Sequence, residues 1–324
     1  PRMAIIYTNK NKEMQNFLTG ASLDIQLGEK DDLQLSMAID DFNLVSNDCY
    51  VFDEEMPQFG GRLDKITVDT STESMTWTGK TFSGMLDEKI VIPPENSAYL
   101  EIQGSFGHVI NELLNLTGLN NLFYTDLTDN PEIDETYRIN RYVSVLSAIR
   151  SIAERLDFSI KTVYNKTERK IMITGNNIKT VGIGEEFNTD QFSFVVEKDY
   201  KKVNFLICLG RGELAERMVV YLYYDDETDT ITEVLSYLQD TVQAVYDYPN
   251  VESREELIQG GIERLKELRN TENIDISPPE DEVYNIGDNI TAKENYTGII
   301  VRKKVTNIIY VSDGETKSIR YETV

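Results

Sequence analysis

A glycine motif between two apolar runs sets the strongest constraint on how this chain folds. Residues 203–209 are apolar, and Gly210-Arg211-Gly212-Glu213-Leu214-Ala215 follows with the G-x-G-x-x-A spacing of the dinucleotide-binding fingerprint. That fingerprint needs a strand, a tight turn and then a helix, because the pyrophosphate binds the free N–H groups of the helix N-terminus. Residues 218–224 are instead rich in β-branched and aromatic residues, which favour a strand. We therefore predict that Gly210 and Gly212 join two strands and that no cofactor binds here.

The net charge is the second strong signal. The chain has 324 residues, a formal net charge of -24 and 40% hydrophobic residues, which is enough for two or three domains with ordinary cores. An acidic surface repels phosphate backbones and argues against specific nucleic-acid binding, although high charge also serves solubility alone. We find no apolar run long enough to span a bilayer and no signal-peptide core. We therefore expect a protein made in the cytoplasm and not secreted by a signal peptide, with no membrane insertion.

Cysteine and histidine are too few for most site chemistry. The chain contains Cys49, Cys208 and one histidine, His108, so a zinc site of the usual Cys/His type cannot form within one chain. His108 lies beside residues with the spacing of an apolar helix face, and we interpret it as an ordinary helix-surface residue. A disulfide between the two cysteines stays open. We predict no catalytic, cofactor-binding or metal-binding residues.

Three further motifs match known sites incompletely. Gly79-Lys80-Thr81 resembles the end of a phosphate-binding loop, but Ser74 stands where its first glycine belongs and residues 75–78 indicate a strand. Asp225-Asp226-Glu227-Thr228-Asp229 has the acidic spacing of an EF-hand loop without its glycine or its terminal glutamate. A polar hairpin turn explains these residues, and weak calcium binding stays open. The adjacent acids Glu185-Glu186 and Asp225-Asp226 would point to opposite faces of a strand and form no shared site.

The hydrophobic pattern changes twice along the chain. Residues 1–90 alternate polar and apolar residues and predict the hairpins of a small barrel or sandwich. Residues 91–186 predict an α+β domain, with an amphipathic helix at 106–116, a second helix carrying apolar residues from 145 to 156, and a hairpin. Residues 187–324 are again mainly β, with a helical insertion around 250–270 that begins at the capping box Ser253-Arg254-Glu255-Glu256. We predict the last strands at 284–286, 299–305, 308–311 and 318–321, with a turn at Asp313-Gly314.

Charge is unevenly distributed. Residues 222–282 contain 17 acidic and 4 basic residues, a net charge of -13. More than half of the excess negative charge of the chain therefore lies in less than a fifth of its length.

Five segments, in this order, carry a resemblance to a known family. They are Gly79 to Val91, the helix 106–116, Arg141 to Phe158, Leu209-Gly210-Arg211-Gly212-Glu213, and Tyr284-Asn285-Ile286-Gly287-Asp288. Together they span nearly the whole chain. In order and spacing the chain resembles the baseplate or tail-tip hub proteins of phage tails and related contractile injection systems, in particular the prophage tail proteins of Gram-positive bacteria.

The resemblance implies a structural part of a virion tail rather than an enzyme. It implies a ring-shaped homotrimer in which each subunit contributes two small β-barrels, from residues 1–90 and 187–324, while the α+β domain and the helical insertion lie outside. Its partners would be the tail tube or distal tail protein, the spike or fibre protein and the tape-measure protein. DNA would pass through without specific binding, and the acidic charge would then line the channel. Because the strands end near Val324, we expect no appended enzyme domain.

Two other functions stay open. With 56 acidic residues, the chain could hold the two carboxylates of a cell-wall glycan hydrolase of the tail tip. With 18 tyrosines, it could instead be a β-type receptor- or carbohydrate-binding tail protein with aromatic residues lining a groove.

Overall fold

The computed structural model divides into two compact units. Unit 1 contains residues 1–194, 275–293 and 302–323, and unit 2 contains residues 195–274 and 294–301. The structure describes residues 5–127, 135–181, 193–197, 201–235, 238, 241–269, 273–277, 283–293 and 300–324.

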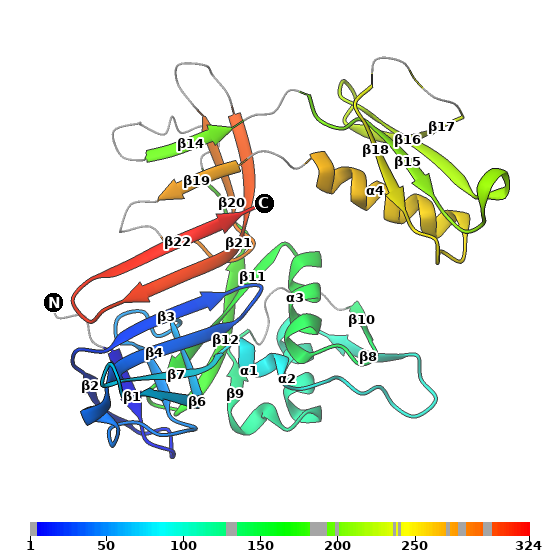
Figure 1. Cartoon of the computed structure of the whole chain (residues 1–324). Helices are drawn as coiled ribbons and strands as arrows, with labels where there is room; N and C mark the ends of the chain where they lie inside the picture. Colours follow the sequence, from blue (N-terminus) through cyan, green and yellow to red (C-terminus); the bar gives the residue numbers. More distant parts are fainter. Residues whose placement is uncertain are drawn as a thin grey trace. The chain divides into compact units, whose positions relative to one another are not determined.

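One sheet of eleven strands forms much of unit 1 (Figure 1). Its order is β13-β20-β21-β3-β4-β7-β6-β5-β1-β2, and β22 also pairs with β21. Its strands are β1 (Ile5–Thr8), β2 (Met14–Leu18), β3 (Ser22–Leu27), β4 (Asp32–Ala38), β5 (Tyr50–Asp53), β6 (Gly60–Asp69), β7 (Ser74–Thr81), β13 (Thr180–Val181), β20 (Asn289–Lys293), β21 (Ile300–Ser312) and β22 (Lys317–Thr323). A 3-10 turn, η1 (Ile39–Asp41), follows β4.

The two hairpins predicted in the first ninety residues are confirmed. β3 pairs antiparallel with β4, and β6 pairs antiparallel with β7. Alternation places Leu23 and Ile25 of β3 on the same face as Leu33 and Leu35 of β4, and all four side chains are buried. The period of two in the sequence therefore determined which face of this sheet meets the core.

The C-terminal strands differ in detail from the prediction. β21 is one continuous strand where we predicted two, because a register shift between Val305 and Asn307 interrupts the pattern without ending the strand. Residues 284–286, predicted as a strand, form a turn held by Asp288, whose carboxylate accepts from the N–H of Asn285 at 2.8 Å and of Lys179 at 3.0 Å. The Asp313-Gly314 turn between β21 and β22 is confirmed, with Gly314 at φ +82°.

The α+β, mainly β class is confirmed, but no sheet closes into a barrel among the described residues. β21, from the C-terminal part, pairs with β3, from the N-terminal part. Strands that we assigned to two separate barrels therefore share one sheet. The division into residues 1–90, 91–186 and 187–324 stays a prediction.

The middle of the chain forms the α+β part of unit 1. Helices α2 (Phe106–Leu116) and α3 (Val145–Arg155) contact each other and pack on a three-stranded sheet in the order β11-β12-β9 (Figure 1). Ser105 and Ser144 cap the two helices by accepting from the N–H groups of His108 and Ser147. The remaining elements are α1 (Gly84–Asp87), β8 (Tyr99–Gly104), η2 (Leu119–Asn121), β9 (Phe123–Thr125), β10 (Glu135–Asn140), β11 (Phe158–Asn165) and β12 (Lys170–Asn177), and β8 pairs with β10. Both predicted helices and the predicted hairpin are confirmed.

A buried ion pair connects the β3–β4 turn to α3. The Asp31 carboxylate, with its side chain 6% exposed, lies 2.8 Å from Nη1 of Arg150 and accepts from Oγ of Ser83 at 2.7 Å. Nη1 of Arg150 also donates to the carbonyl of Gly28 at 2.9 Å. These contacts join parts of unit 1 that are more than a hundred residues apart in sequence.

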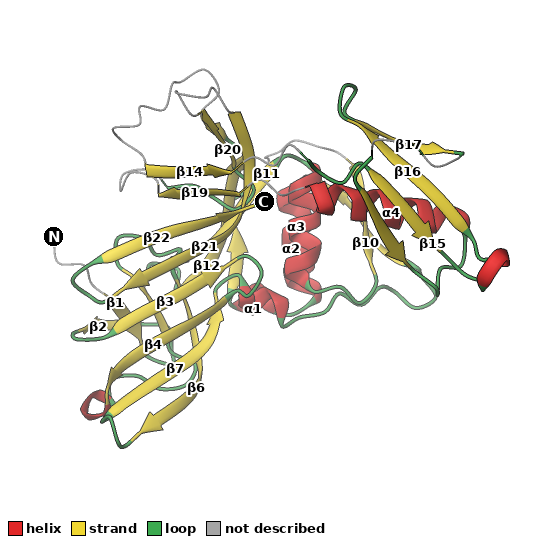
Figure 2. Ribbon diagram, turned by 45° about the horizontal axis from the view of Figure 1, so that its top comes forward, coloured by secondary structure: helices red, strands yellow, loops and turns green. Residues whose placement is uncertain are grey.

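Unit 2 is a four-stranded sheet with one helix on one face (Figure 2). The order is β17-β16-β15-β18, from β15 (Phe205–Leu209), β16 (Val219–Asp225), β17 (Thr230–Val234) and β18 (Gln243–Asp247), with η3 (Leu214–Glu216) between β15 and β16. The helix is α4 (Arg254–Arg269). Two further strands pair with each other and flank these elements in sequence. β14 (Ser193–Glu197) precedes β15, and β19 (Asn273–Ser277) follows α4.

Of the two glycines that weaken α4 in isolation, Gly261 has a packing reason. A Cβ at Gly261 would lie 2.5 Å from Sγ of Cys208 and 2.7 Å from Cδ1 of Leu222, so glycine lets the helix approach the sheet closely. At the start of α4, the N–H of Glu256 donates to Oγ of Ser253 at 3.1 Å, as the capping box predicts. The Glu256 carboxylate reaches the N–H of Glu252 rather than that of Ser253.

Candidate functional site

The G-x-G-x-x-A motif forms a turn between two antiparallel strands, as predicted. β15 pairs with β16, and only the three-residue η3 lies between them. The N–H of Gly210 donates to the carbonyl of Met218 at 2.8 Å, and Gly212 has φ +107°. A Cβ at Gly210 would lie 2.9 Å from Cδ2 of Leu257. The absence of a side chain at Gly210 therefore lets α4 pack closely against this turn. The strand–turn–helix arrangement that a pyrophosphate needs is not formed by these residues.

The other sequence motifs also take the local structures predicted for them. Gly79-Lys80-Thr81 ends β7, and the short α1 begins only at Gly84, whose N–H donates to Oγ1 of Thr81 at 3.0 Å. Asp225 to Asp229 form the turn between β16 and β17, where the Asp225 carboxylate accepts from the N–H of Glu227 at 2.9 Å. Glu185 and Glu186 lie outside the described residues.

The single histidine and the two cysteines belong to no group of potential metal ligands among the described residues. His108 is exposed in the first turn of α2, which confirms its position on the helix surface. Cys49 and Cys208 are both free and buried, so no disulfide joins them. Burial raises the pKa of the Cys208 thiol to about 11, which keeps it protonated and unreactive at neutral pH.

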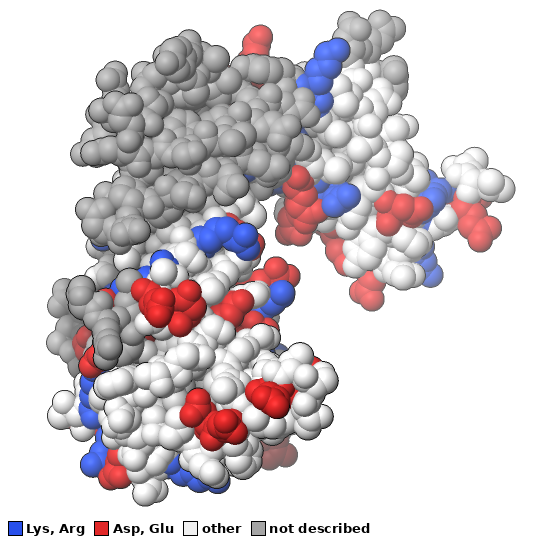
Figure 3. All heavy atoms as spheres, turned by 60° about the vertical axis from the view of Figure 1, so that its left-hand side comes forward, with Lys and Arg blue, Asp and Glu red and all other residues white. Residues whose placement is uncertain are grey.

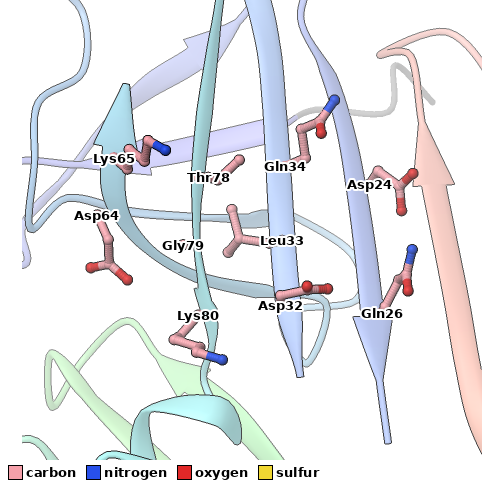
Figure 4. Close-up of a pocket in the computed structure, with 10 residues that line it drawn as sticks. All are labelled: Asp24, Gln26, Asp32, Leu33, Gln34, Asp64, Lys65, Thr78, Gly79 and Lys80. Carbon is pink, nitrogen blue, oxygen red and sulfur yellow. The ribbon is translucent and has the colours of Figure 1, made fainter. Parts of the chain in front are cut away.

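One groove gathers polar side chains of which the sequence analysis singled out only Lys80. It has a volume of about 370 Å³ and lies on the face of β3, β4, β7 and β6 (Figure 4). Its walls carry three carboxylates, two ammonium groups and two amides: Asp24, Asp32, Asp64, Lys65, Lys80, Gln26 and Gln34. Leu33, Thr78 and Gly79 complete the lining.

Strand pairing brings two of these carboxylates near each other. Asp24 is opposite Gln34 and Gln26 is opposite Asp32, so Asp24 and Asp32 are diagonal neighbours on one face, a spacing of about 7–8 Å between Cα atoms. One oxygen of Asp24, Oδ1, is buried without a hydrogen-bond partner among the described residues. Burial, and then the negative charge of Asp32, raise the pKa of Asp24.

The charged side chains are mixed on the part of the surface that Figure 3 shows. On the face in Figure 3, groups of Asp and Glu lie apart from one another with Lys and Arg among them. No group of three or more potential metal ligands is found in the described part of the chain. Among the described residues, no helix is both long and apolar enough to cross a membrane.

Solved structures share this fold over their full length. The 43 kDa tail protein of prophage MuSo2 from Shewanella oneidensis aligns with a TM-score of 0.53 at 11% identity, covering 99% of this chain and 96% of that one. A tail protein from Neisseria meningitidis aligns at 0.53 and 11% identity, covering 100% and 97%. The prophage tail protein gp18 from Listeria monocytogenes aligns at 0.50 and 14% identity, covering 99% and 94%. No protein-family model and no curated protein matches the sequence. The fold is that of prophage tail proteins.

Proposed function

We propose that this protein is a structural hub at the tip of a phage or prophage tail. One observation carries the proposal: the fold is shared with three tail proteins, two of them from prophages, over at least 94% of each chain, so the likeness extends beyond a single common domain. In this role the chain forms a ring-shaped homotrimer around the DNA channel and performs no catalysis. The strands that we assigned to two barrels then supply one shared sheet from each subunit to the ring.

The partners follow from this position. The ring joins the tail tube or distal tail protein to the spike or fibre protein, and the tape-measure protein ends at it. DNA passes without specific binding, which the net charge of -24 supports, because like charges repel. The mixed charges in Figure 3 argue against a uniformly acidic surface, so the acidic residues of the channel wall form only part of the total.

Two measurements test the hub. Light scattering on the purified chain should give three times the subunit mass of 37.1 kDa, and single-particle images should show threefold rings. An antibody against the chain should label one end of tails induced from cells that carry the gene. Label along the tail shaft or on the capsid would rule out a hub.

A glycan hydrolase is the second candidate, because Asp24 and Asp32 share the groove of Figure 4 and the pKa of Asp24 is raised. Glycosidases use two carboxylates about 5–10 Å apart, one of them protonated. The purified chain should then degrade murein and lose this activity in Asp24→Asn, while Asp69→Asn, a change at the exposed end of β6, leaves it intact. If the unmodified chain releases no sugar from murein, this candidate fails.

A further inference from the structure

The four-stranded sheet of unit 2 ends at β18, which runs parallel to β15 and pairs with no other described strand (Figure 1). Hydrogen bonds at the two ends of β18 show which of its backbone groups face β15. The carbonyl of Val242 accepts from the N–H of Phe205 at 3.1 Å, and the N–H of Tyr248 donates to the carbonyl of Leu209 at 2.8 Å. Because backbone groups alternate in direction along a strand, the even-numbered residues of β18 bind β15.

The odd-numbered residues of β18 are Gln243, Val245 and Asp247, and their backbone N–H and C=O groups therefore point away from the sheet. We call these backbone groups the free edge of β18. Val245, at the centre of this edge, is 59% exposed, so the edge is accessible from solvent. An accessible row of backbone groups without a neighbouring strand is a template for pairing with another chain.

The free edge of β18 lacks the features that protect other edges. Edge strands are commonly protected by lysine, proline or a β-bulge. β2, which ends the eleven-stranded sheet, has an irregular register with β1, and the N–H of Phe17 in β2 donates to the side chain of Asn16 at 2.9 Å. β18 has the sequence Gln-Ala-Val-Tyr-Asp and an unbroken register with β15. Its free edge therefore remains able to pair.

We infer that β18 pairs antiparallel with β18 of a second copy of the chain, about a twofold axis at Val245. In this register Val245 lies opposite its own counterpart, and Gln243 lies opposite Asp247 of the second copy. Each of these pairs exchanges two backbone hydrogen bonds, because the free edges supply all the donors and acceptors. The two four-stranded sheets then form one continuous sheet. The contact is separate from the trimer proposed above.

The exposed side chains of β18 complement each other in this register. Val245 meets an identical apolar side chain at the axis. The Gln243 amide donates one N–H to Oγ1 of Thr241 at 3.0 Å, which leaves its second N–H for the Asp247 carboxylate of the second copy. That carboxylate is 57% exposed, although it also pairs with Arg217. The pairing therefore brings no like charges together.

Other features favour this register and leave room for it. A shift that centres the pairing on Asp247 would place two carboxylates opposite each other and bring Pro249, which has no N–H, into the paired edge. On the helix side of the sheet, the small Ala244 lies opposite the large Tyr246 of the second copy. Helix α4 packs mainly on β15 and β16, so the two copies of this helix lie apart on one face of the continuous sheet.

Opposite charges at Val245 test the twofold contact on the full chain. Val245→Lys and Val245→Glu each place like charges at the axis, whereas an equal mixture of the two variants places opposite charges there. The control pair, Thr232→Lys and Thr232→Glu, introduces the same charges at an exposed position of β17, the other edge of the same sheet. Light scattering over a concentration series measures mass, and hydrogen exchange measures the protection of the outward amides of Gln243 and Val245.

We expect the mass of the unmodified chain to double as its concentration rises, and the two outward amides to become protected over the same range. Each Val245 variant should weaken this step at least about 30-fold, because like charges then meet at the axis. The mixture should return to within about tenfold of the unmodified chain, which also shows that both variants fold. The control variants should match the unmodified chain.

Three results would overturn the inference. They are a mass that does not double, a doubling that neither Val245 variant weakens, and a mixture that associates no better than its two components. The hub is judged separately. If the chain forms trimers, the contact pairs two rings and the Val245 variants stay trimeric. If no trimer forms, the same contact takes the chain from monomer to dimer.

Discussion

The phenol of Tyr310 donates a hydrogen bond to Oδ2 of Asp53 at 2.6 Å, between two buried residues 257 positions apart. Tyr310 belongs to β21 and Asp53 ends β5, strands that are not neighbours in the sheet. The ring of Tyr310 also stacks on Phe59, with 4.5 Å between centroids. The eleven-stranded sheet therefore curls enough to bring β21 close to β5.

Removing this hydroxyl should destabilise unit 1. In Tyr310→Phe the Asp53 carboxylate, 1% exposed, loses its partner on Oδ2 and keeps only the N–H groups of Glu55 and Met56 on Oδ1. We expect the free energy of unfolding to fall by about 1–3 kcal/mol, measured by urea denaturation at pH 7. Tyr142→Phe, at a position 61% exposed, is the matched control and should change little. Equal effects of the two changes would contradict this account.

The same phenol predicts sensitivity to alkaline pH. Burial first, and then the hydrogen bond to Asp53, raise the pKa of Tyr310 above its ordinary value of 10.0. Above that pH the unfolded chain loses the proton while the folded chain keeps it, so the unfolded state binds fewer protons and stability falls as pH rises. The contribution of Tyr310 should be constant between about pH 7 and 9 and decline above about pH 10. Denaturation across this range should show a shallower decline of the unfolding free energy with pH in Tyr310→Phe. An identical slope in both proteins would contradict the prediction.

Arg150→Met should weaken the attachment of α3 to the first hairpin. The change leaves Asp31 buried without its cation, although the hydroxyl of Ser83 still donates to it. Because the Arg150 side chain is 33% exposed, we expect a loss of only about 2 kcal/mol, below the range for a fully buried pair. Arg138→Met breaks a pair whose side chains are 71% and 53% exposed and should cost about 0–1 kcal/mol. Thermal unfolding of both variants makes the comparison, and a reversed order would refute it.

The adjacent glycines of α4 should respond oppositely to alanine. Gly261→Ala forces a methyl group against Cys208 and Leu222 and should destabilise unit 2 by about 1–3 kcal/mol. This loss outweighs the gain in helix propensity from glycine to alanine. At Gly260 the nearest atom, 2.8 Å from the new Cβ, is the terminal oxygen of Tyr246, which can move away. We expect Gly260→Ala to be neutral or mildly stabilising. Hydrogen exchange of β15 and β16 amides measures the effect locally, and equal protection in both variants would contradict the packing argument.

Unit 2 should be removable without unfolding unit 1. The core residues of unit 2 form a separate cluster from those of the α+β part. The strands that precede and follow residues 201–269 in sequence, β14 and β19, pair with each other. Replacing residues 201–269 with a short Gly/Ser linker should therefore leave the melting temperature of unit 1 within a few degrees of its value in the full chain. Calorimetry provides the measurement, with the loss of one transition expected. A shortened chain that fails to fold would show that the two units depend on each other.

Local patterns predicted the elements well. The spacing of Phe106, Val109, Ile110, Leu113 and Leu114 predicted α2 from its first to its last residue, because the period of a buried helix face is a property of the chain itself. The residues after Gly212 likewise predicted a strand. The prediction at 284–286 was wrong, because the buried carboxylate of Asp288 organises a turn there that the apolar pattern does not reveal.

The groove could not be predicted in this way, nor could the shared face of Lys161 and Lys170. Asp24 and Asp32 are diagonal neighbours on one face because β3 and β4 pair in one particular register. Lys161 and Lys170 share a face for the same reason in β11 and β12. A shift of one residue in either register would move these side chains to the opposite face.

The sequence by itself determined that residues 210–215 are a turn between strands, because β-branched and aromatic residues follow them and a helix does not. Only the tertiary structure decided what the two glycines do: Gly210 makes room for Leu257 of α4, and Gly212 supplies a backbone angle of +107°. Local preference depends on neighbours in the chain, whereas close approach depends on an element some forty residues away. The same limit applies to β21, whose pairing with β3 joins the two ends of the chain in one sheet.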